Sequence, residues 1–303
     1  MMNMTEKLQD RILQLKQKRN AMILAHNYQI PEVQDIADIV GDSLELARAA
    51  KSIECDVIVF CGVDFMAETA CILNPGKTVL LPSIEACCPM AAMIRADEVR
   101  MLRRRFPDAA VVSYVNTTAE VKAESDICCT SSNAIQVVES LDQEQVIFLP
   151  DKNLASYVAR FSSKEILPWQ GYCFVHDRIR PEDVLKARRA HPDAKLLVHP
   201  ECRPEVIDMA DMVSSTSGMI KHVCSAPEEE FIIGTEIGIL HGLKKQCPEK
   251  ICYPLSSQAI CTNMKRTDLT KVCESLELLQ PRITVPEDVA NRARKAIERM
   301  LEV

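Results

Sequence analysis

The sequence predicts an α/β protein made of three similar small parallel-sheet domains that surround a pseudo-threefold axis. Two observations carry this prediction: an internal repeat of about 85 residues, and the alternation of short apolar runs with amphipathic stretches. Nearly continuous apolar runs are typical of parallel strands, because helices cover both faces of such a sheet. A single large sheet would not repeat in this way.

The repeat is clearest between the middle and the later part of the chain. Segment 103–109 (RRRFPDA) is echoed 85 residues later by segment 188–194 (RRAHPDA). The same offset relates three further pairs, which are Asp126 and Asp211, Ser131 and Thr216, and Cys88 and Cys173. Because these matches need no gap, they indicate duplicated structural units.

The elements of each copy follow from this alignment and from the hydrophobic pattern. First strands are expected at 21–27, 110–115 and 195–199, second strands at 57–61, 127–130 and 212–215, and third strands at 78–81, 145–149 and 231–235. Amphipathic helices are expected at 31–51, 98–105 and 181–189, with a polar helix at 1–19 and a closing helix at 287–301. The first copy is expected to hold extra residues between its first two strands, including the turn Gly41-Asp42-Ser43.

The repeat also sets the expected domain limits. We expect βαβ, Rossmann-like domains at residues 1–87, 88–172 and 173–260. Residues 261–303 are expected to pack back on the first domain. Three like domains of this kind can close around a common axis.

Composition narrows the possible partners and locations. The net charge of −7 does not favour a broad surface for nucleic acid or for anionic membranes. No apolar run reaches the length of a membrane span, and the N-terminal stretch does not resemble a signal peptide, so a cytoplasmic protein is expected. Fourteen cysteines are too few for a disulfide scaffold, and a reducing compartment is expected.

Polar side chains follow all three predicted first strands. These strands end in the segments 26–28 (HNY), 114–116 (YVN) and 199–201 (HPE). Ligands of parallel α/β sheets bind at the carboxyl ends of strands, so equivalent polar exits favour a binding site over capped loops. Glu201 is the only carboxylate among them, and it is the best candidate for a general acid/base. Tyr28, Tyr114 and His199 add hydrogen-bonding aromatic side chains at the same exits.

Hydroxyl-rich segments follow two second strands, at 128–133 (CCTSSN) and 214–218 (SSTSG). Such residues are often simple helix caps. The same geometry also presents free N–H groups and the positive end of a helix dipole to an anion. Two such exits facing an axis would suit carboxylates or a phosphate.

Three cysteines recur at the spacing of the repeat. Cys88, Cys173 and Cys261 are separated by 85 and 88 residues, so their thiolates could converge on the axis. Three thiolates fit an iron–sulfur cluster with one open iron, or zinc that also binds a water. The chain contains no C-x-x-C pair, which argues against zinc ribbons and ferredoxin-type runs.

Taken together, the motifs resemble those of the quinolinate synthase (quinolinate synthetase A) family, iron–sulfur enzymes of de novo NAD biosynthesis. The matching stretches run in order over nearly the whole chain; they are 25–28 (AHNY), 41–43 (GDS), 88–91 (CPMA), 114–116 (YVN), 128–131 (CCTS), 169–173 (WQGYC), 198–202 (VHPEC), 215–219 (STSGM) and 261–265 (CTNMK). One departure is the third cysteine motif, where some members carry C-x-x-C-x-x-C and this chain has Cys261 alone. That difference concerns any disulfide regulation and leaves the cluster ligands in place.

The resemblance implies that iminoaspartate condenses with dihydroxyacetone phosphate to give quinolinate, phosphate and water. It implies one 4Fe–4S cluster on Cys88, Cys173 and Cys261, whose open iron acts as a Lewis acid. Implied substrate-binding positions are His26, Ser43, Tyr114, Val115, Asn116, Ser131, His199, Pro200, Glu201 and Thr216, and implied catalytic residues are Glu201, Tyr28 and His199. An aspartate oxidase that supplies iminoaspartate is a possible transient partner, whereas no nucleic acid or membrane partner is expected.

Two other classes of protein could bind metal through the same three cysteines. A non-catalytic iron–sulfur carrier or oxygen sensor would explain the cysteines, but not Tyr28, Asn116 and Glu201 at matching strand exits. A zinc-dependent lyase is the third class. An iron and sulfide count on anaerobically purified protein separates the zinc-dependent lyase from the two iron–sulfur classes.

Overall fold

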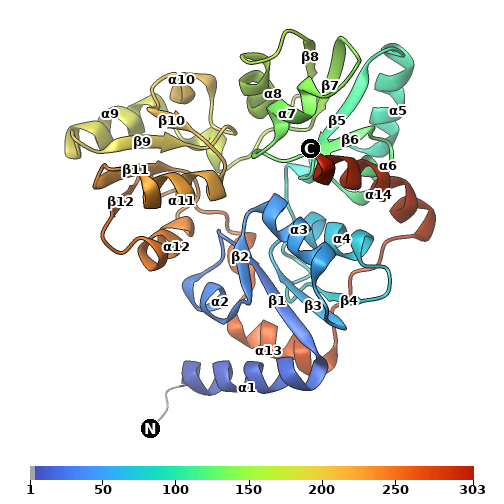
Figure 1. Ribbon diagram of the computed structural model, residues 1–303, viewed down its shortest axis with the longest axis vertical. Helices are drawn as coiled ribbons and strands as arrows, with labels where there is room; N and C mark the ends of the chain where they lie inside the picture. Colours follow the sequence, from blue (N-terminus) through green and yellow to red (C-terminus); the bar gives the residue numbers. More distant parts are fainter. Residues whose placement is uncertain (1–3) are drawn as a thin grey trace.

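The computed structural model describes residues 4–303, and it contains three four-stranded sheets whose strands are all parallel (Figure 1). The strands are β1 Ala21–His26, β2 Ile39–Gly41, β3 Val57–Cys61, β4 Thr78–Leu80, β5 Ala110–Tyr114, β6 Ile127–Cys129, β7 Gln145–Leu149, β8 Glu165–Pro168, β9 Lys195–Val198, β10 Met212–Val213, β11 Glu230–Gly234 and β12 Ile251–Pro254. The strand orders are β2-β1-β3-β4, β6-β5-β7-β8 and β10-β9-β11-β12. The predicted fold class is confirmed.

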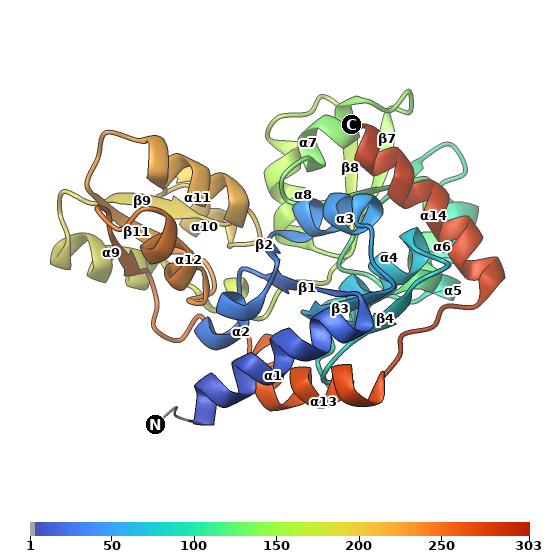
Figure 2. The same ribbon diagram turned by 60° about the horizontal axis from the view of Figure 1, so that its bottom comes forward.

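Helices connect the strands and cover the sheets (Figure 2). They are α1 Met4–Arg19, α2 Pro31–Ile36, α3 Ser43–Ser52, α4 Asp64–Leu73, α5 Ala96–Arg105, α6 Ala119–Ala123, α7 Ala134–Glu139, α8 Lys152–Ala159, α9 Pro181–Ala190, α10 Pro204–Ile207, α11 Thr216–Ser225, α12 Ile239–Gln246, α13 Leu269–Leu278 and α14 Glu287–Glu302. Residues 1–3 of the expected N-terminal helix lie outside the described residues. None of the described helices is both long and apolar enough to cross a membrane.

The three sheets are built to the same plan. In each, the first and second strands pair residues 15 positions apart, as in Leu24 with Ile39 and Val112 with Ile127. An aspartate before each second strand accepts a hydrogen bond from a backbone N–H of the first strand; these aspartates are Asp38, Asp126 and Asp211, at 2.7, 2.8 and 2.7 Å. The repeat therefore extends to individual backbone contacts.

The predicted strand alignment of the first domain was wrong. Its second strand is β2, Ile39–Gly41, and segment 57–61 is the equivalent of β7 and β11 instead. The first domain therefore has no extra residues between its first two strands. Segment 31–51, expected as one helix, divides into α2, β2 and most of α3. The strand between the two helices has only three residues and is partly buried. The apolar residues of the whole segment therefore keep a helix-like spacing, and the sequence pattern does not reveal the strand.

The hydrophobic core joins two of the domains. The strands β3 and β5 are buried along their whole length, as expected for strands covered on both faces. One apolar cluster runs through the first and second sheets and includes Ile297 and Met300 of α14. The third domain has two clusters of its own, and in Figure 1 it forms the separate lobe at the left.

The C-terminal segment divides between two domains. Helix α13 packs on α1 and β3 of the first domain, where the whole segment was expected. Helix α14 instead packs mainly on α6 and β6 of the second domain, and also on α4 (Figure 1). Hydrogen bonds hold it to both sides: Arg294 donates to the Ile72 carbonyl at 2.8 Å, and Asn133 donates to the Met300 carbonyl at 3.2 Å. The segment thus links the two domains that share a core.

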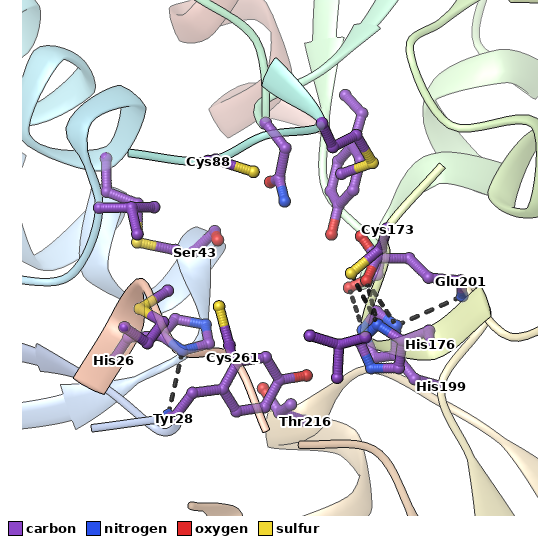
Figure 3. A pocket seen from close by; sticks show the side chains of 18 of the residues that line it. His26, Tyr28, Ser43, Cys88, Cys173, His176, His199, Glu201, Thr216 and Cys261 are labelled. Carbon is purple, nitrogen blue, oxygen red and sulfur yellow. Dashed lines mark hydrogen bonds and ion pairs between the residues drawn. The ribbon is translucent and has the colours of Figure 1, made fainter. Parts of the chain in front are cut away.

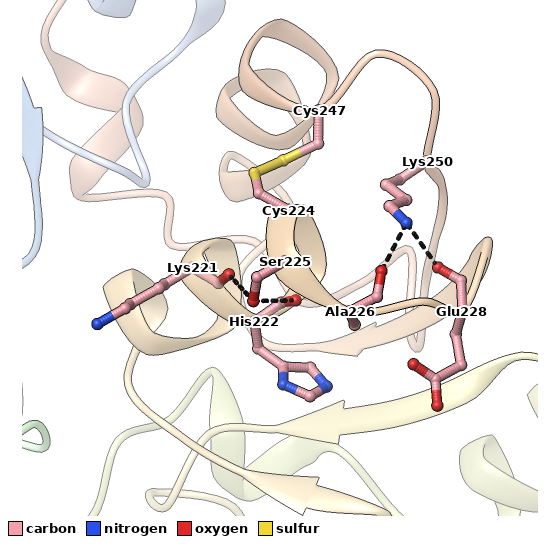
Figure 4. The surroundings of a disulfide bond; sticks show 8 residues. All are labelled: Lys221, His222, Cys224, Ser225, Ala226, Glu228, Cys247 and Lys250. Carbon is pink, nitrogen blue, oxygen red and sulfur yellow. Dashed lines mark hydrogen bonds between the residues drawn. A yellow bond between two sulfur atoms is a disulfide. The ribbon is translucent and has the colours of Figure 1, made fainter.

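One pair of cysteines is oxidised, which the sequence did not predict. Cys224 of α11 and Cys247 at the end of α12 form a disulfide in the third domain (Figure 4). Their Cα atoms are 5.3 Å apart, within the usual range for such a bond. The other twelve cysteines of the described residues are free thiols.

Candidate active site

Loops at the carboxyl ends of strands from all three domains line one cavity of about 710 Å³, which includes open solvent at its mouth (Figure 3). Four sets of repeat-related residues line it. They are His26, Tyr114 and His199; Tyr28, Asn116 and Glu201; Ser43, Ser131 and Thr216; and Cys88, Cys173 and Cys261. Two predicted substrate positions are not among the described residues that line it: Val115 packs in the core and Pro200 lines a neighbouring cavity.

Each of the three cysteines precedes a short 3₁₀ helix that begins three residues further on. These helices are η1 Ala91–Met93, η2 His176–Arg178 and η3 Met264–Arg266. Burial raises the pKa of each thiol, and a backbone N–H at the start of the following helix opposes the rise. A bound metal would supply the positive charge that keeps such buried thiols ionised.

A hydrogen-bonded group surrounds Glu201, which is 3% exposed. Its Oε2 lies 2.7 Å from Nδ1 of His176 and 3.4 Å from Nδ1 of His199. Burial favours the neutral acid, but the two histidines prevail and hold the pKa of Glu201 well below its usual value. Glu201 is therefore ionised at neutral pH.

The hydrogen bonds continue from His176 to Tyr28. Nε2 of His176 lies 2.8 Å from the Thr235 hydroxyl, and that hydroxyl lies 2.6 Å from the Tyr28 hydroxyl. Burial, and then Glu201, raise the pKa of Tyr28, so the phenol keeps its proton. The resulting chain of Glu201, His176, Thr235 and Tyr28 can carry a proton between two faces of the cavity.

The sequence prediction missed His176 and Thr235. His176 occupies the position of Ala91 and Met264 in the other copies, three residues after the cysteine. A histidine at a repeat position that is otherwise apolar was a usable signal. Thr235 follows β11, and its repeat partner is Pro150, so nothing in the pattern marked it.

Two buried oxygens at equivalent strand exits lack a partner. Among the described residues, five buried side-chain atoms have no hydrogen bond, and two of these are Oδ1 of Asn116 and Oε1 of Glu201. An unsatisfied buried polar atom costs roughly 1–3 kcal/mol, and such costs are typical of sites that a ligand completes. Both residues line the cavity, so a ligand with hydrogen-bond donors would satisfy them there.

The acid stability of the protein should depend on His26. Burial lowers the pKa of His26 to about 4, and its Nδ1 accepts a hydrogen bond from the Tyr28 N–H at 3.1 Å. The unfolded chain, with a histidine pKa near 6.5, binds the proton first, so stability falls as the pH drops from 6.5 towards 4.

We expect the His26→Asn variant to lose about 2 kcal/mol less free energy of unfolding than the wild type between pH 7 and 5. Asparagine can still accept a hydrogen bond but does not titrate. Urea unfolding at the two pH values measures the difference. Identical losses in both proteins would show that His26 does not govern this acid response.

Comparison with known proteins places the chain in a family. The family described as "Quinolinate synthetase A protein" matches residues 10–302. A protein of Methanoregula boonei named "Quinolinate synthase" is 65% identical over 300 residues, covering 99% of each chain. "Quinolinate synthase 1" of Methanosarcina acetivorans is 56% identical over 97% of this chain and 96% of its own. "Quinolinate synthase" of Thermodesulfovibrio yellowstonii is 55% identical over 98% and 99%. The chain therefore belongs to the quinolinate synthetase A family of enzymes.

Proposed function

We propose that this enzyme condenses iminoaspartate with dihydroxyacetone phosphate to give quinolinate, phosphate and water, a step of de novo NAD biosynthesis. Family membership and the names of the relatives support quinolinate synthesis. The observation that carries the proposal is the convergence of four repeat-related residue sets, including three cysteines, on one cavity. A transient partnership with aspartate oxidase and a cytoplasmic location stay predictions.

The cysteines fit the cluster that we propose for this site. Cys88, Cys173 and Cys261 come from equivalent loops, and their sulfurs face the same cavity (Figure 3). Among residues 4–303, the only three potential ligands whose atoms all lie within 4.8 Å of one another are Cys173, His176 and Glu201. The three sulfur atoms are therefore not all within 4.8 Å of one another, which suits a larger group better than a single zinc ion. A 4Fe–4S cluster on three cysteines would supply an open iron as a Lewis acid.

Glu201 is the proposed general acid/base. Its ionised carboxylate keeps one oxygen on His176 and leaves Oε1 without a partner in the cavity, where it can take a proton from a substrate carbon or nitrogen. His199, whose pKa is lowered by burial, is a neutral donor or acceptor beside it. Tyr28 keeps its proton and can donate to a carbonyl or imine, and its hydrogen-bond chain to Glu201 can replace the proton.

Anionic substrate groups would be held without lysine or arginine, since neither occurs among the described residues that line the cavity. Ser43 and Thr216 are the first residues of α3 and α11, so both helices begin at the cavity. The N-terminus of a helix carries a partial positive charge that favours an anion. This site is stronger at α11, because in α3 the Asp42 carboxylate already accepts from the N–H groups of Leu44 and Glu45. We therefore assign Ser43, Ser131 and Thr216 to substrate carboxylates or phosphate.

The direct test is an anaerobic assay of the purified, iron-loaded enzyme. Dihydroxyacetone phosphate and freshly generated iminoaspartate should yield quinolinate, detected by chromatography, together with inorganic phosphate. Loss of product when either substrate is omitted is the internal control. Protein that carries a full cluster but forms no quinolinate would refute the proposed activity and favour a carrier or sensor.

Substrate contacts should be separable from metal binding. We expect Tyr114→Phe and Asn116→Ala to keep their iron and their fold but to raise KM or lower kcat, because both side chains line the cavity and neither is a metal ligand. Iron content, melting temperature and steady-state kinetics of each variant check this. If both variants unfold or lose iron, these residues serve the fold rather than the substrate.

A further inference from the structure

Three carboxylates occupy equivalent positions directly behind the cysteine loops. Each carboxylate lies just after the strand that is third in the spatial order of its sheet. Asp64 follows β3, Asp151 follows β7 and Glu236 follows β11. Each accepts a hydrogen bond from the backbone N–H of one cysteine: Asp64 from Cys88, Asp151 from Cys173 and Glu236 from Cys261, all at 3.1 Å. The cavity residues discussed above do not include these three.

A second hydrogen bond accompanies each of the first ones. In each domain a backbone N–H donates to the carbonyl two residues before the cysteine. The donor is Asp64 itself in the first domain and the residue after the carboxylate in the other two. The pairs are Asp64 with Ala86 at 2.8 Å, Lys152 with Gly171 at 2.9 Å, and Ile237 with Ala259 at 3.0 Å. We call each pair of hydrogen bonds a clasp, because it ties the cysteine loop to the beginning of α4, α8 or α12.

The clasp recurs although the chain around it differs. The carboxylate and the cysteine are separated by 24, 22 and 25 residues in the three domains, and the third domain uses glutamate instead of aspartate. The clasp is also closely packed at Gly171, where a Cβ would lie 2.5 Å from the Pro150 carbonyl oxygen. Geometry that persists through changes in loop length and residue type indicates a function of its own.

The clasps also do more than cap helices. A helix start needs only an acceptor for its own N–H groups, as Asp151 provides for Asn153 at 2.7 Å and Leu154 at 2.8 Å. The extra hydrogen bond to the cysteine N–H fixes the backbone from which the thiol projects. Loops that are held in this way present their ligands without paying the ordering entropy on metal binding.

We propose that Asp64, Asp151 and Glu236 are positioning residues for the metal centre, which act through the cysteine N–H groups and hold the three thiols ready for the cluster. This inference rests on the cluster assigned under the proposed function. Because the carboxylate oxygen acts as a hydrogen-bond acceptor, an amide at the same position should replace it, whereas alanine should not.

The test measures iron release from reconstituted enzyme to a chelator under anaerobic conditions. We expect Asp64→Ala and Glu236→Ala to lose iron about 10–100-fold faster than the wild type, a range typical of changes behind metal ligands. Asp64→Asn should stay near the wild-type rate. Glu236 also forms an ion pair with Lys265 at 3.0 Å, so the two Asp64 variants alone isolate the acceptor role. The matched control is Asp268→Ala, which removes a carboxylate that caps α13 by accepting from the backbone N–H of Lys271 instead of from a cysteine.

The outcomes separate this inference from the proposed function. Wild-type rates in both alanine variants, or equal acceleration in Asp268→Ala, would overturn the positioning role while leaving the cluster in place. Equal acceleration in Asp64→Ala and Asp64→Asn would overturn the acceptor role in the same way. A wild type that takes up no iron would overturn the proposed function and the clasp's role together. Melting temperatures of the metal-free variants distinguish fast release caused by unfolding from fast release caused by the lost hydrogen bond.

Discussion

The Glu201→Gln variant should retain its cluster and fold but form quinolinate about 10²–10⁴-fold more slowly than the wild type. Glutamine fits the site, because the repeat partner of Glu201 is already an amide, Asn116. The amide oxygen can still accept from His176, but it cannot accept and return a proton. The loss should therefore fall on the rate and not on iron content.

The control for this prediction is His199→Asn. His199 is the neighbouring candidate, with its Nδ1 3.4 Å from the Glu201 carboxylate. If His199 were the proton acceptor, His199→Asn would lower the rate more than Glu201→Gln. An iron-replete Glu201→Gln enzyme with a near-normal rate would refute the role of Glu201. The initial rate of anaerobic quinolinate formation, normalised to iron, decides between the two residues.

Replacing any one of Cys88, Cys173 or Cys261 by serine should abolish stable cluster binding. Each substitution would leave only two thiolate ligands. A serine hydroxyl is a poor iron ligand in place of the third, because it stays protonated near neutral pH. The matched control is Cys87→Ser, an exposed free thiol directly beside Cys88. Cys55→Ser, a buried free thiol, is a second control.

Both controls should bind iron like the wild type. Absorbance of the brown anaerobic protein and its iron content measure the effect in each variant. A full cluster in any of the three ligand variants would show that the cysteine was assigned wrongly. Loss of iron from Cys87→Ser would show that the loop, rather than the thiol, limits binding.

The repeat made most of the fold and many of the cavity residues predictable. First strands and their polar exits could be aligned because their apolar runs are long and the offset between copies is constant. Ser43 could not be aligned in this way. Its equivalence to Ser131 and Thr216 follows from strand β2, which is too short to be recognised between two helices. The resemblance to a family supplied Ser43, but the hydrophobic pattern did not.

Other features depend on contacts that no local pattern encodes. The hydrogen-bond chain through His176 and Thr235 joins residues 59 positions apart, and it exists only because β11 ends beside the Cys173 loop. The clasps likewise join residues separated by more than twenty positions, with different side chains in different copies. The disulfide between Cys224 and Cys247 depends on how α11 and α12 pack.

The measurement that most directly tests the account is an iron, sulfide and zinc count on wild-type protein purified without oxygen. Three repeat-spaced cysteines that face one cavity predict a brown protein with about four iron and about four sulfide per chain and no stoichiometric zinc. That colour should bleach in air. A colourless protein with one zinc per chain and no sulfide would contradict the account.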